Sequence, residues 1–351
     1  MPGSAARTTT ADVVCLGESM VTFLPSRPGR LADVPAFSRG IGGAESNVAC
    51  ALAASGHRAK WVGRVGADGF GDHLVDAIAG YGVDTSAVRR DPHRPTGIYF
   101  RTATDRATDT HEVAYYRAGS AASAMSPHNA PYEDLLTGRV LHLSGITAAL
   151  SADCLALLHD LTAPREGRPL ISFDVNHRPG LWQAGDAGPE VLLDLARRSD
   201  LVFVGEDEAE EAWGVHGTEA IRTALPEPEV LVVKRGADGA TVFSRTAGSQ
   251  ADTVTTVPSL HVDVVAAVGA GDAFAAGFLS ATLRGLPVRD RARHGHLMAA
   301  AVLTVPGDLT APPARAHADR LAALDDTAWE TLRLGPGWTA AGQAPEEVRV
   351  T

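Results

Sequence analysis

The sequence predicts an α/β protein with a doubly wound, mostly parallel sheet and a small β-sheet lid. Short runs that are apolar at every position alternate along the chain with longer segments rich in Ala and Leu. Such runs are typical of strands covered by helices on both faces, and their alternation with helices is typical of a parallel sheet. Two other stretches alternate apolar and polar residues and are not followed directly by a helix, which indicates a separate antiparallel sheet.

The elements follow in order along the chain. Strands of the main sheet are expected at residues 13–16, 59–62, 140–143, 170–173, 201–204 and 230–233, and helices at residues 45–55, 72–81, 152–161, 189–198 and 272–284. Lid strands are expected at residues 31–39 and 96–118, over a site at the carboxyl ends of the main strands. Residues 11–325 should form one domain. Residues 1–10, which are small and polar, and residues 336–351, which are rich in Gly, Pro and Ala, are expected to be flexible tails.

The composition argues against several classes of partner. Of the 351 residues, 45% are hydrophobic and 21% are charged, as in ordinary soluble globular proteins. The formal net charge of −11 argues against binding to nucleic acid or to an anionic membrane, because both require a basic surface. Cys15, Cys50 and Cys154 form no Cys-x-x-Cys pair, which is typical of buried thiols in a reduced compartment. Since the first residues contain no apolar leader, we expect a cytoplasmic protein without a membrane partner.

The residues that indicate chemistry are Gly269-Ala-Gly-Asp272, at the start of an expected helix. Glycines let backbone N–H groups turn toward a ligand, and a helix start adds unpaired donors and partial positive charge, so the segment is a candidate anion site. An Asp in the first turn would lie beside a bound phosphate and could accept the proton of an attacking hydroxyl. Phosphoryl transfer requires positioning, charge stabilisation and such a base. The alternative is that Asp272 is only a helix cap.

Three motifs, in the same order along the chain, resemble those of the PfkB carbohydrate kinases. Residues 269–278 read GAGDAFAAGF, residues 42–47 with 63–71 resemble the N-terminal signature, and residues 234–239 read KRGADG. The resemblance extends over residues 13–313 and implies a ribokinase-like fold, ATP, Mg²⁺, a sugar-like substrate and a lid that forms a homodimer. It also implies a role for each of several residues. Asp272 would be the base, and the backbone of Gly269, Ala270 and Gly271 would form the anion hole. The sugar would be bound by Gly42, Gly43 and Asn47, and the nucleotide by Lys234, Gly236 and Gly239.

Within this family, the sequence resembles 2-keto-3-deoxygluconate kinases at residues 42–47, 115–123 and 173–182. The resemblance places Asn176 and Arg178 between the sugar and ATP. Arg117 and Arg178 suit the carboxylate of an acidic sugar, because a guanidinium can donate two parallel hydrogen bonds to it. The alternative is that both are surface arginines in solvated ion pairs. Tyr115 and Tyr116 point in opposite directions on a strand, so only one of them faces the site, and we assign Tyr116 to it.

The sequence departs from the family pattern at two places. Ala266 and Ala267 stand where the family has Asp-Thr, and because that Asp helps to hold a monovalent cation, activation by such a cation is doubtful. Gly205 stands where the family has an Asn of the Mg²⁺ motif, whereas Glu208 of the same motif is kept. Glu208 is therefore expected to act on Mg²⁺ indirectly, through water.

Other functions stay open at this point. Residues 17–25 also resemble the opening of kinases that act on acarbose-type pseudo-sugars, so a cyclitol or pseudo-sugar is an alternative substrate. A non-catalytic protein that binds a sugar or nucleotide is an alternative from another class, because the fold alone does not prove activity. A nucleoside kinase would need an aromatic base pocket, to which Tyr99 and Phe100 could contribute, but the two arginines favour a polar or anionic substrate.

Overall fold

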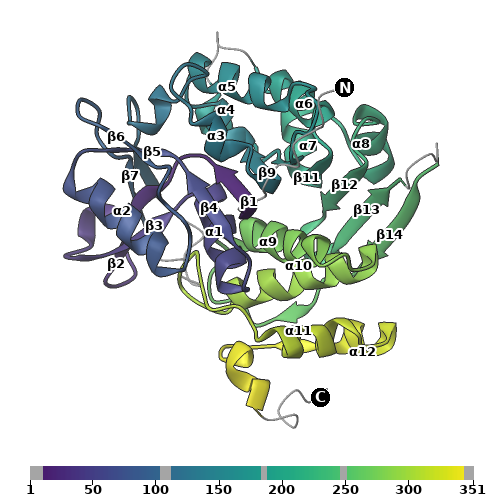
Figure 1. Cartoon of the computed structure of the whole chain (residues 1–351). Helices are drawn as coiled ribbons and strands as arrows, with labels where there is room; N and C mark the ends of the chain where they lie inside the picture. The colour runs from purple at the N-terminus through teal and green to yellow at the C-terminus, as the bar shows by residue number, and fades with distance from the viewer. Residues whose placement is uncertain (1–10, 103–111, 183–187, 246–250, 344–351) are drawn as a thin grey trace.

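The centre of the molecule is an eight-stranded sheet in the order β14-β13-β12-β11-β10-β9-β1-β4 (Figure 1). The computed structural model describes residues 11–102, 112–182, 188–245 and 251–343. Strands β12 to β4 of this order are parallel, and β13 and β14 extend the sheet antiparallel. The bounds are β1 Ala11–Leu16, β4 Ala59–Val62, β9 Gly138–Ser144, β10 Leu170–Asp174, β11 Leu201–Gly205, β12 Val230–Lys234, β13 Ala240–Ser244 and β14 Thr253–Val257.

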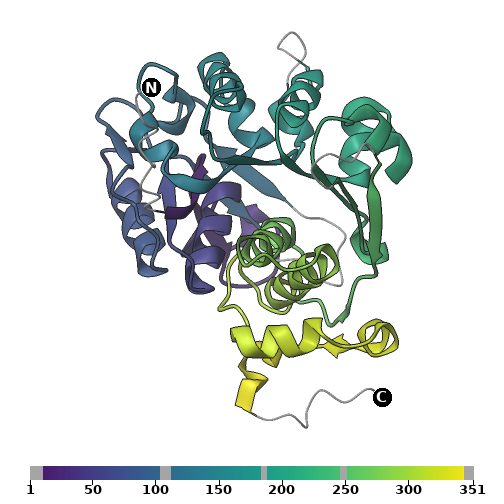
Figure 2. The same cartoon turned by 45° about the vertical axis from the view of Figure 1, so that its right-hand side comes forward.

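Helices cover both faces of this sheet (Figure 2). One face packs against α3 Tyr132–Leu135, α4 Gly145–Ala148, α5 Ala152–Thr162, α6 Glu190–Arg197, α7 Glu206–Trp213 and α8 Thr218–Ala224. The other is covered by α1 Ala44–Ala54, α2 Gly69–Gly80, α9 Ala270–Leu283 and α10 Val288–Leu303, and α11 Arg315–Ala322 and α12 Asp326–Thr331 lie beneath α9 and α10. The central strands are therefore buried on both sides, which explains why their sequences are apolar at every position.

A four-stranded lid projects beside this core. It lies at the end of the molecule where β2 and β3 are labelled in Figure 1. Its order is β3-β2-β7-β8, from β2 Met20–Pro25, β3 Phe37–Gly42, β7 Ile98–Arg101 and β8 Val113–Tyr116. The pairs β2–β3 and β7–β8 are antiparallel, whereas β2 and β7 are parallel. Two short pairs complete the strands: β5 Arg64–Gly66 with β6 Arg89–Asp91, and β15 His261–Val262 with β16 Arg333–Leu334.

The doubly wound sheet and the separate lid agree with the fold expected from the sequence, and two details of the lid differ. Residues 31–33 form a turn of 3₁₀ helix, and the lid strand begins only at Phe37. Strand β2 also belongs to the lid, although its apolar sequence gave no sign of it. Of the expected segment 96–118, residues 103–111 lie outside the described residues.

Packed structure continues past residue 325, through α12 and β16 to a 3₁₀ helix at Trp338–Gln343. Trp338 is buried and packs near His317 of α11, so part of the expected C-terminal tail belongs to the core. Both outermost stretches, 1–10 and 344–351, lie outside the described residues. Among the described helices, none combines the length and apolarity that a membrane crossing requires.

Candidate active site

Two cavities meet at the carboxyl ends of the parallel strands. The first, with a volume of 980 Å³, lies under the lid and is called the lid cavity here. The second, of 1580 Å³, lies between the start of α7 and the segment that follows β14, and is called the α7 cavity. Both volumes are large enough for small-molecule ligands. The residues that line both cavities are Arg178, Glu208, Lys234, Ala267, Ala270 and Gly271, so the two spaces are continuous around the start of α9.

Helix α9 begins at this junction. Gly269 precedes it in the left-handed conformation, with φ of +78°, and a Cβ there would lie 2.6 Å from the backbone oxygen of Asp308. Only glycine fits such a position, which explains the first glycine of the motif. Phe274 and Phe278 on the same helix are buried in the core and fix its direction. The unpaired N–H groups of the first turn therefore face the place where the cavities meet.

Asp272 lies in that first turn and lines the lid cavity. Its carboxylate accepts a 2.9 Å hydrogen bond from the side-chain amide of Asn47. Gly269, not Asp272, holds the helix-cap position, so the structure does not support the helix-cap alternative. Burial raises the pKa of Asp272 to about 7, and the charge of Asp174 acts in the same direction, whereas the Asn47 hydrogen bond and Arg178 oppose it. A carboxylate with a pKa near neutrality suits a general base.

Asp174 and Lys234 form an ion pair in the same cavity as Asp272. Asp174 ends β10 and is buried, and Lys234 ends β12, with its Nζ 3.1 and 3.2 Å from the two carboxylate oxygens of Asp174. Burial alone would lower the pKa of Lys234, but the charges of Asp174 and Glu208 raise it, so the lysine is positively charged. Asp174 is not among the site residues predicted from the sequence. Its position at the carboxyl end of a main strand, within residues 173–182, could have indicated it.

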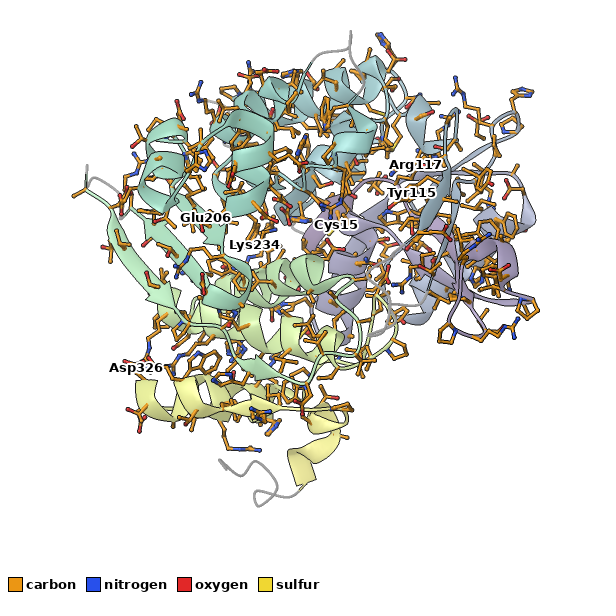
Figure 3. The ribbon with its side chains drawn as sticks, turned by 180° about the vertical axis from the view of Figure 1, so that it is seen from behind. Cys15, Tyr115, Arg117, Glu206, Lys234 and Asp326 are labelled. Carbon is orange, nitrogen blue, oxygen red and sulfur yellow. The ribbon has the colours of Figure 1, made fainter. Side chains whose placement is uncertain are left out.

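Arg117 forms a buried ion pair with Glu18, and both side chains line the lid cavity. Glu18 is 1% exposed, and it also accepts a 2.6 Å hydrogen bond from the Ser120 hydroxyl. The positive charge of Arg117 is therefore already balanced inside the protein. Figure 3 shows Arg117 with Tyr115 on the lid side of the site and Lys234 with Glu206 on the opposite side.

The lid presents Tyr115, not Tyr116, to the site, which corrects the assignment made from the sequence. Tyr115 lines the lid cavity, and its ring lies 5.5 Å from that of Tyr99. Tyr116 points to the outer face of the lid, is 64% exposed and contacts Phe100 edge to face. Alternation along the strand predicted that only one tyrosine would face the site. Which of the two does so depends on how β8 pairs with β7, and the sequence does not show this pairing.

A second buried ion pair joins the lid to the core. Arg101 of β7 donates to Asp308, at 2.8 Å, and the Tyr99 hydroxyl donates to the same carboxylate, at 3.0 Å. Asp308 and Tyr99 both line the lid cavity. A Cβ on Gly42 would lie 2.4 Å from the Tyr99 oxygen, so this glycine lets the lid approach the core. Asp308 was not predicted from the sequence, because the residues next to it give no sign of its contact with β7, about 200 residues earlier.

The fold brings the other residues assigned to the sugar together with Asn176, which was assigned between the sugar and ATP. Gly42, Gly43, Asn47 and Asn176 all line the lid cavity. Asn176 adopts a positive φ of 42°, which is rare for a residue other than glycine. Arg178 is half exposed between the two cavities, with its Nη1 3.8 Å from Glu208. Its effect on the pKa of Asp272 places its charge near the base.

Of the residues assigned to the nucleotide, Lys234, Gly236 and Gly239 line the α7 cavity, whereas Asn176 lines only the lid cavity. Gly236 and Gly239, both with positive φ, form the turn between β12 and β13 that borders it. His296 of α10 also lines it, which the sequence gave no reason to expect; burial lowers the pKa of this histidine to about 4, so it is neutral. Its Nε2 is buried and has no hydrogen-bond partner among the described residues.

The residues present fit a Mg²⁺ ion that is held mainly by phosphates and water. Glu208 accepts the Gly205 N–H with one carboxylate oxygen, which leaves the other for a ligand or a water. Within the described ranges, no group of three or more His, Cys, Asp or Glu side chains could enclose a metal ion. Mg²⁺ in phosphoryl-transfer sites commonly uses one or two carboxylates together with phosphate oxygens and waters.

A carboxylate with a pKa raised to about 7, on the first turn of a helix that begins where two cavities connect, is typical of a phosphotransferase that acts on a small hydroxyl compound. The chain belongs to the PfkB family of carbohydrate kinases, whose model matches residues 10–315. It is an ATP-dependent sugar kinase with the ribokinase-like fold.

Proteins similar to this chain include two 2-dehydro-3-deoxygluconokinases and a further PfkB protein. The 2-dehydro-3-deoxygluconokinase of Bacillus subtilis is 35% identical over 309 residues, which cover 87% of this chain and 93% of that protein. A PfkB protein from Polaromonas sp. JS666 has a structure with a TM-score of 0.77 and 34% identity, covering 88% of this chain and 99% of that chain. The structure of 2-dehydro-3-deoxygluconokinase from Thermotoga maritima has a TM-score of 0.77 and 26% identity, covering 89% and 98%.

Proposed function

We propose that this kinase phosphorylates a hydroxyl of a 2-keto-3-deoxy sugar acid (a 2-dehydro-3-deoxygluconate-like substrate), with Asp272 as the base. The observation that carries the proposal is the position of Asp272 in the lid cavity, beside Ala270 and Gly271, which line both cavities, with a pKa raised to about 7. The substrate class is supported by the name of the Bacillus subtilis and Thermotoga maritima relatives. Arg117 and Arg178 in the wall of the lid cavity are consistent with an anionic sugar.

In the proposed reaction, the lid cavity holds the sugar and the α7 cavity holds ATP. The Asp272 carboxylate takes the proton of the sugar hydroxyl, whose oxygen forms a bond to the γ-phosphorus of ATP. The bond between that phosphorus and the β–γ bridging oxygen breaks, and ADP leaves. Backbone N–H groups of residues 269–271 and the charge of Lys234 stabilise the negative charge on the transferred group. Mg²⁺, when bound near Glu208, would neutralise phosphate charge.

A neutral pseudo-sugar or cyclitol is a second candidate, and one observation favours it. Glu18 already balances the charge of Arg117, so a substrate carboxylate beside Arg117 would also lie close to the Glu18 carboxylate. Like charges at short range in a buried site are unfavourable. Arg178, which is half exposed, is therefore the better candidate for a carboxylate ligand.

A substrate panel separates the two candidates. ADP release with Mg·ATP is measured with 2-keto-3-deoxygluconate, fructose, ribose, adenosine and a cyclitol or acarbose-like pseudo-sugar. Turnover of the keto-deoxy acid, with a raised KM in Arg178→Met, supports the sugar-acid proposal. Turnover only of a neutral compound rejects it and keeps the kinase. The same assays with and without K⁺ test our expectation that Ala266 and Ala267, which lack ligating side chains, leave the enzyme independent of this ion.

We further propose that the enzyme is a homodimer formed through the outer face of the lid. Phe23, Phe37, Phe100 and Tyr116 form one aromatic cluster on that face, with Phe23 and Phe100 stacked at 4.6 Å. Tyr116 is exposed and the three phenylalanines are half-buried, and aromatic residues are enriched in protein interfaces. A Tyr116→Asp variant should shift the molar mass in solution from dimer to monomer, and a wild-type protein that is monomeric at all concentrations rejects the proposal.

We place the enzyme in the cytoplasm, without nucleic-acid or membrane partners. All three cysteines are free and buried, and the net charge is −11. Cell fractionation tests the location, and recovery of the protein in the membrane fraction would contradict it.

A further inference from the structure

The C-terminal segment, defined here as residues 326–334, lies beyond the residues that match the family model and folds back onto the core. The family match ends at residue 315. After it, α12 and β16 pass beneath α9 and α10, as the yellow part of Figure 1 shows. Trp329, Leu332 and Leu334 are all buried in the same core cluster as α9 and α10. The segment is therefore a fixed part of the molecule.

This segment is bonded directly to one wall of the α7 cavity. The wall, called the 258–264 wall here, runs from Pro258 to Val264 and includes β15. The indole N–H of Trp329 donates to the Pro258 carbonyl at 3.0 Å. The backbone N–H groups of His261 and Asp263 donate to the carbonyls of Leu332 and Leu334, at 3.3 and 2.9 Å.

The wall needs such support, because its own strand is very short. Strand β15 has two residues, and an isolated strand pair of that length has little stability of its own. Just after it, Val265 is 43% exposed, although its N–H is bonded to the Leu303 carbonyl of α10 at 2.7 Å. The chain then continues directly into the Gly269 turn of the anion site. The wall is thus held between α10 and the C-terminal segment, and its position fixes one side of the nucleotide space.

We propose that the C-terminal segment positions the 258–264 wall for ATP, so that residues outside the family match set the affinity for the nucleotide. The inference rests on the proposed placement of ATP in the α7 cavity. Trp329, Leu332 and Leu334 act as positioning residues, because they contact the wall and not the reacting atoms. A segment with a merely structural role would change the amount of folded enzyme and leave the affinity of the folded fraction unchanged.

The sharpest variant is Trp329→Phe, which keeps an aromatic side chain, although a smaller one, and removes the hydrogen bond to Pro258. We expect the dissociation constant for ATP, and the KM for ATP, to rise about fivefold, the effect of one lost hydrogen bond. The KM for the sugar should stay within about twofold, because the lid cavity is not in contact with the wall. Trp338→Phe is the matched control: this tryptophan is also buried, but its Nε1 has no hydrogen-bond partner among the described residues.

A pair of truncations gives an independent measurement. A chain that ends at Gln343 keeps the whole segment and should bind ATP as the full chain does. A chain that ends at Thr331 loses β16 and should bind ATP at least about tenfold more weakly, since two backbone hydrogen bonds to the wall are lost. Binding is measured by calorimetry on folded protein, which separates affinity from loss of structure.

The outcomes distinguish this inference from the proposed function. If the wild type binds ATP and Trp329→Phe binds it equally well, the inference is wrong and the kinase proposal stands. If Trp338→Phe weakens ATP binding as much as Trp329→Phe, the effect is general destabilisation and the inference is also wrong. A wild-type protein that binds no ATP would overturn both.

Discussion

The side-chain amide of Asn47, on α1, donates a 2.9 Å hydrogen bond to the carboxylate of Asp272, on the first turn of α9. The bond links a residue assigned to the sugar with the proposed base, so the orientation of the base depends on the helix that lines the lid cavity. Because the amide donates to the charged carboxylate, it lowers the pKa of Asp272 and partly offsets the effect of burial.

Asp272→Asn should abolish most of the turnover. The asparagine keeps the size of the side chain but cannot accept the hydroxyl proton, so kcat should fall by about 10²–10⁴. Substrate binding, measured by calorimetry, should change much less. A kcat within severalfold of the wild-type value would show that another group is the base.

The reaction rate should fall as the pH is lowered through about 7. Only the ionised carboxylate can accept a proton, and the pKa of Asp272 is raised to about 7, so kcat/KM should rise with pH through this value and then level off. A profile that is flat from pH 5.5 to 8 would contradict the raised pKa. Initial rates at saturating ATP over this range provide the test.

Asp174→Asn should move this fall in rate to lower pH. The substitution removes a negative charge that raises the pKa of Asp272 and releases the positive charge of Lys234, which lowers it. A shift of about one pH unit is the expected size for a neighbouring charge. Asp153→Asn, a change of the same kind at an exposed position of α5, is the control and should leave the profile in place.

Tyr115 and Tyr116 offer a matched pair on one strand. Tyr115→Ala should raise the KM for the sugar about five- to tenfold, the effect of one or two lost contacts, because this side chain lines the lid cavity. Tyr116→Ala, on the outer face, should leave the sugar KM within about twofold. Equal effects of the two variants would contradict the pairing of β7 and β8 described here.

Glu18→Ala should destabilise the protein strongly. It leaves the buried guanidinium of Arg117, 10% exposed, without its carboxylate, and removal of one partner of a buried ion pair costs about 3–5 kcal/mol. Chemical denaturation measures this loss. The double variant Glu18→Met with Arg117→Met should recover much of it, since no uncompensated charge stays buried; failure to recover would show that packing, not charge, causes the loss.

The sequence predicts the sheet and the anion turn well, because both depend on local patterns. Runs that are apolar at every position mark buried parallel strands, and Gly269 is a residue that can adopt the left-handed backbone required just before the helix. The contacts across the site were not predictable in this way. Glu18 meets Arg117, and Arg101 meets Asp308, only after distant segments have come together.

Helix α10 is an element of secondary structure that the sequence did not predict. Residues 289–296 of this helix include several charged residues and His294 and His296, so its apolar face is narrow and the sequence gave no clear helical pattern. In the structure those histidines are buried against α9 and its neighbours. Tertiary packing, rather than local periodicity, stabilises this helix.

The way the lid is threaded constrains the order in which the molecule folds. The chain leaves the core after β1 to form β2 and β3, returns for α1, and leaves again much later for β7 and β8. The parallel contact between β2 and β7 joins two strands that β4 and α2 separate along the chain. Because such distant contacts carry a large entropy cost, we expect the lid to be among the last parts to assemble and among the first to open.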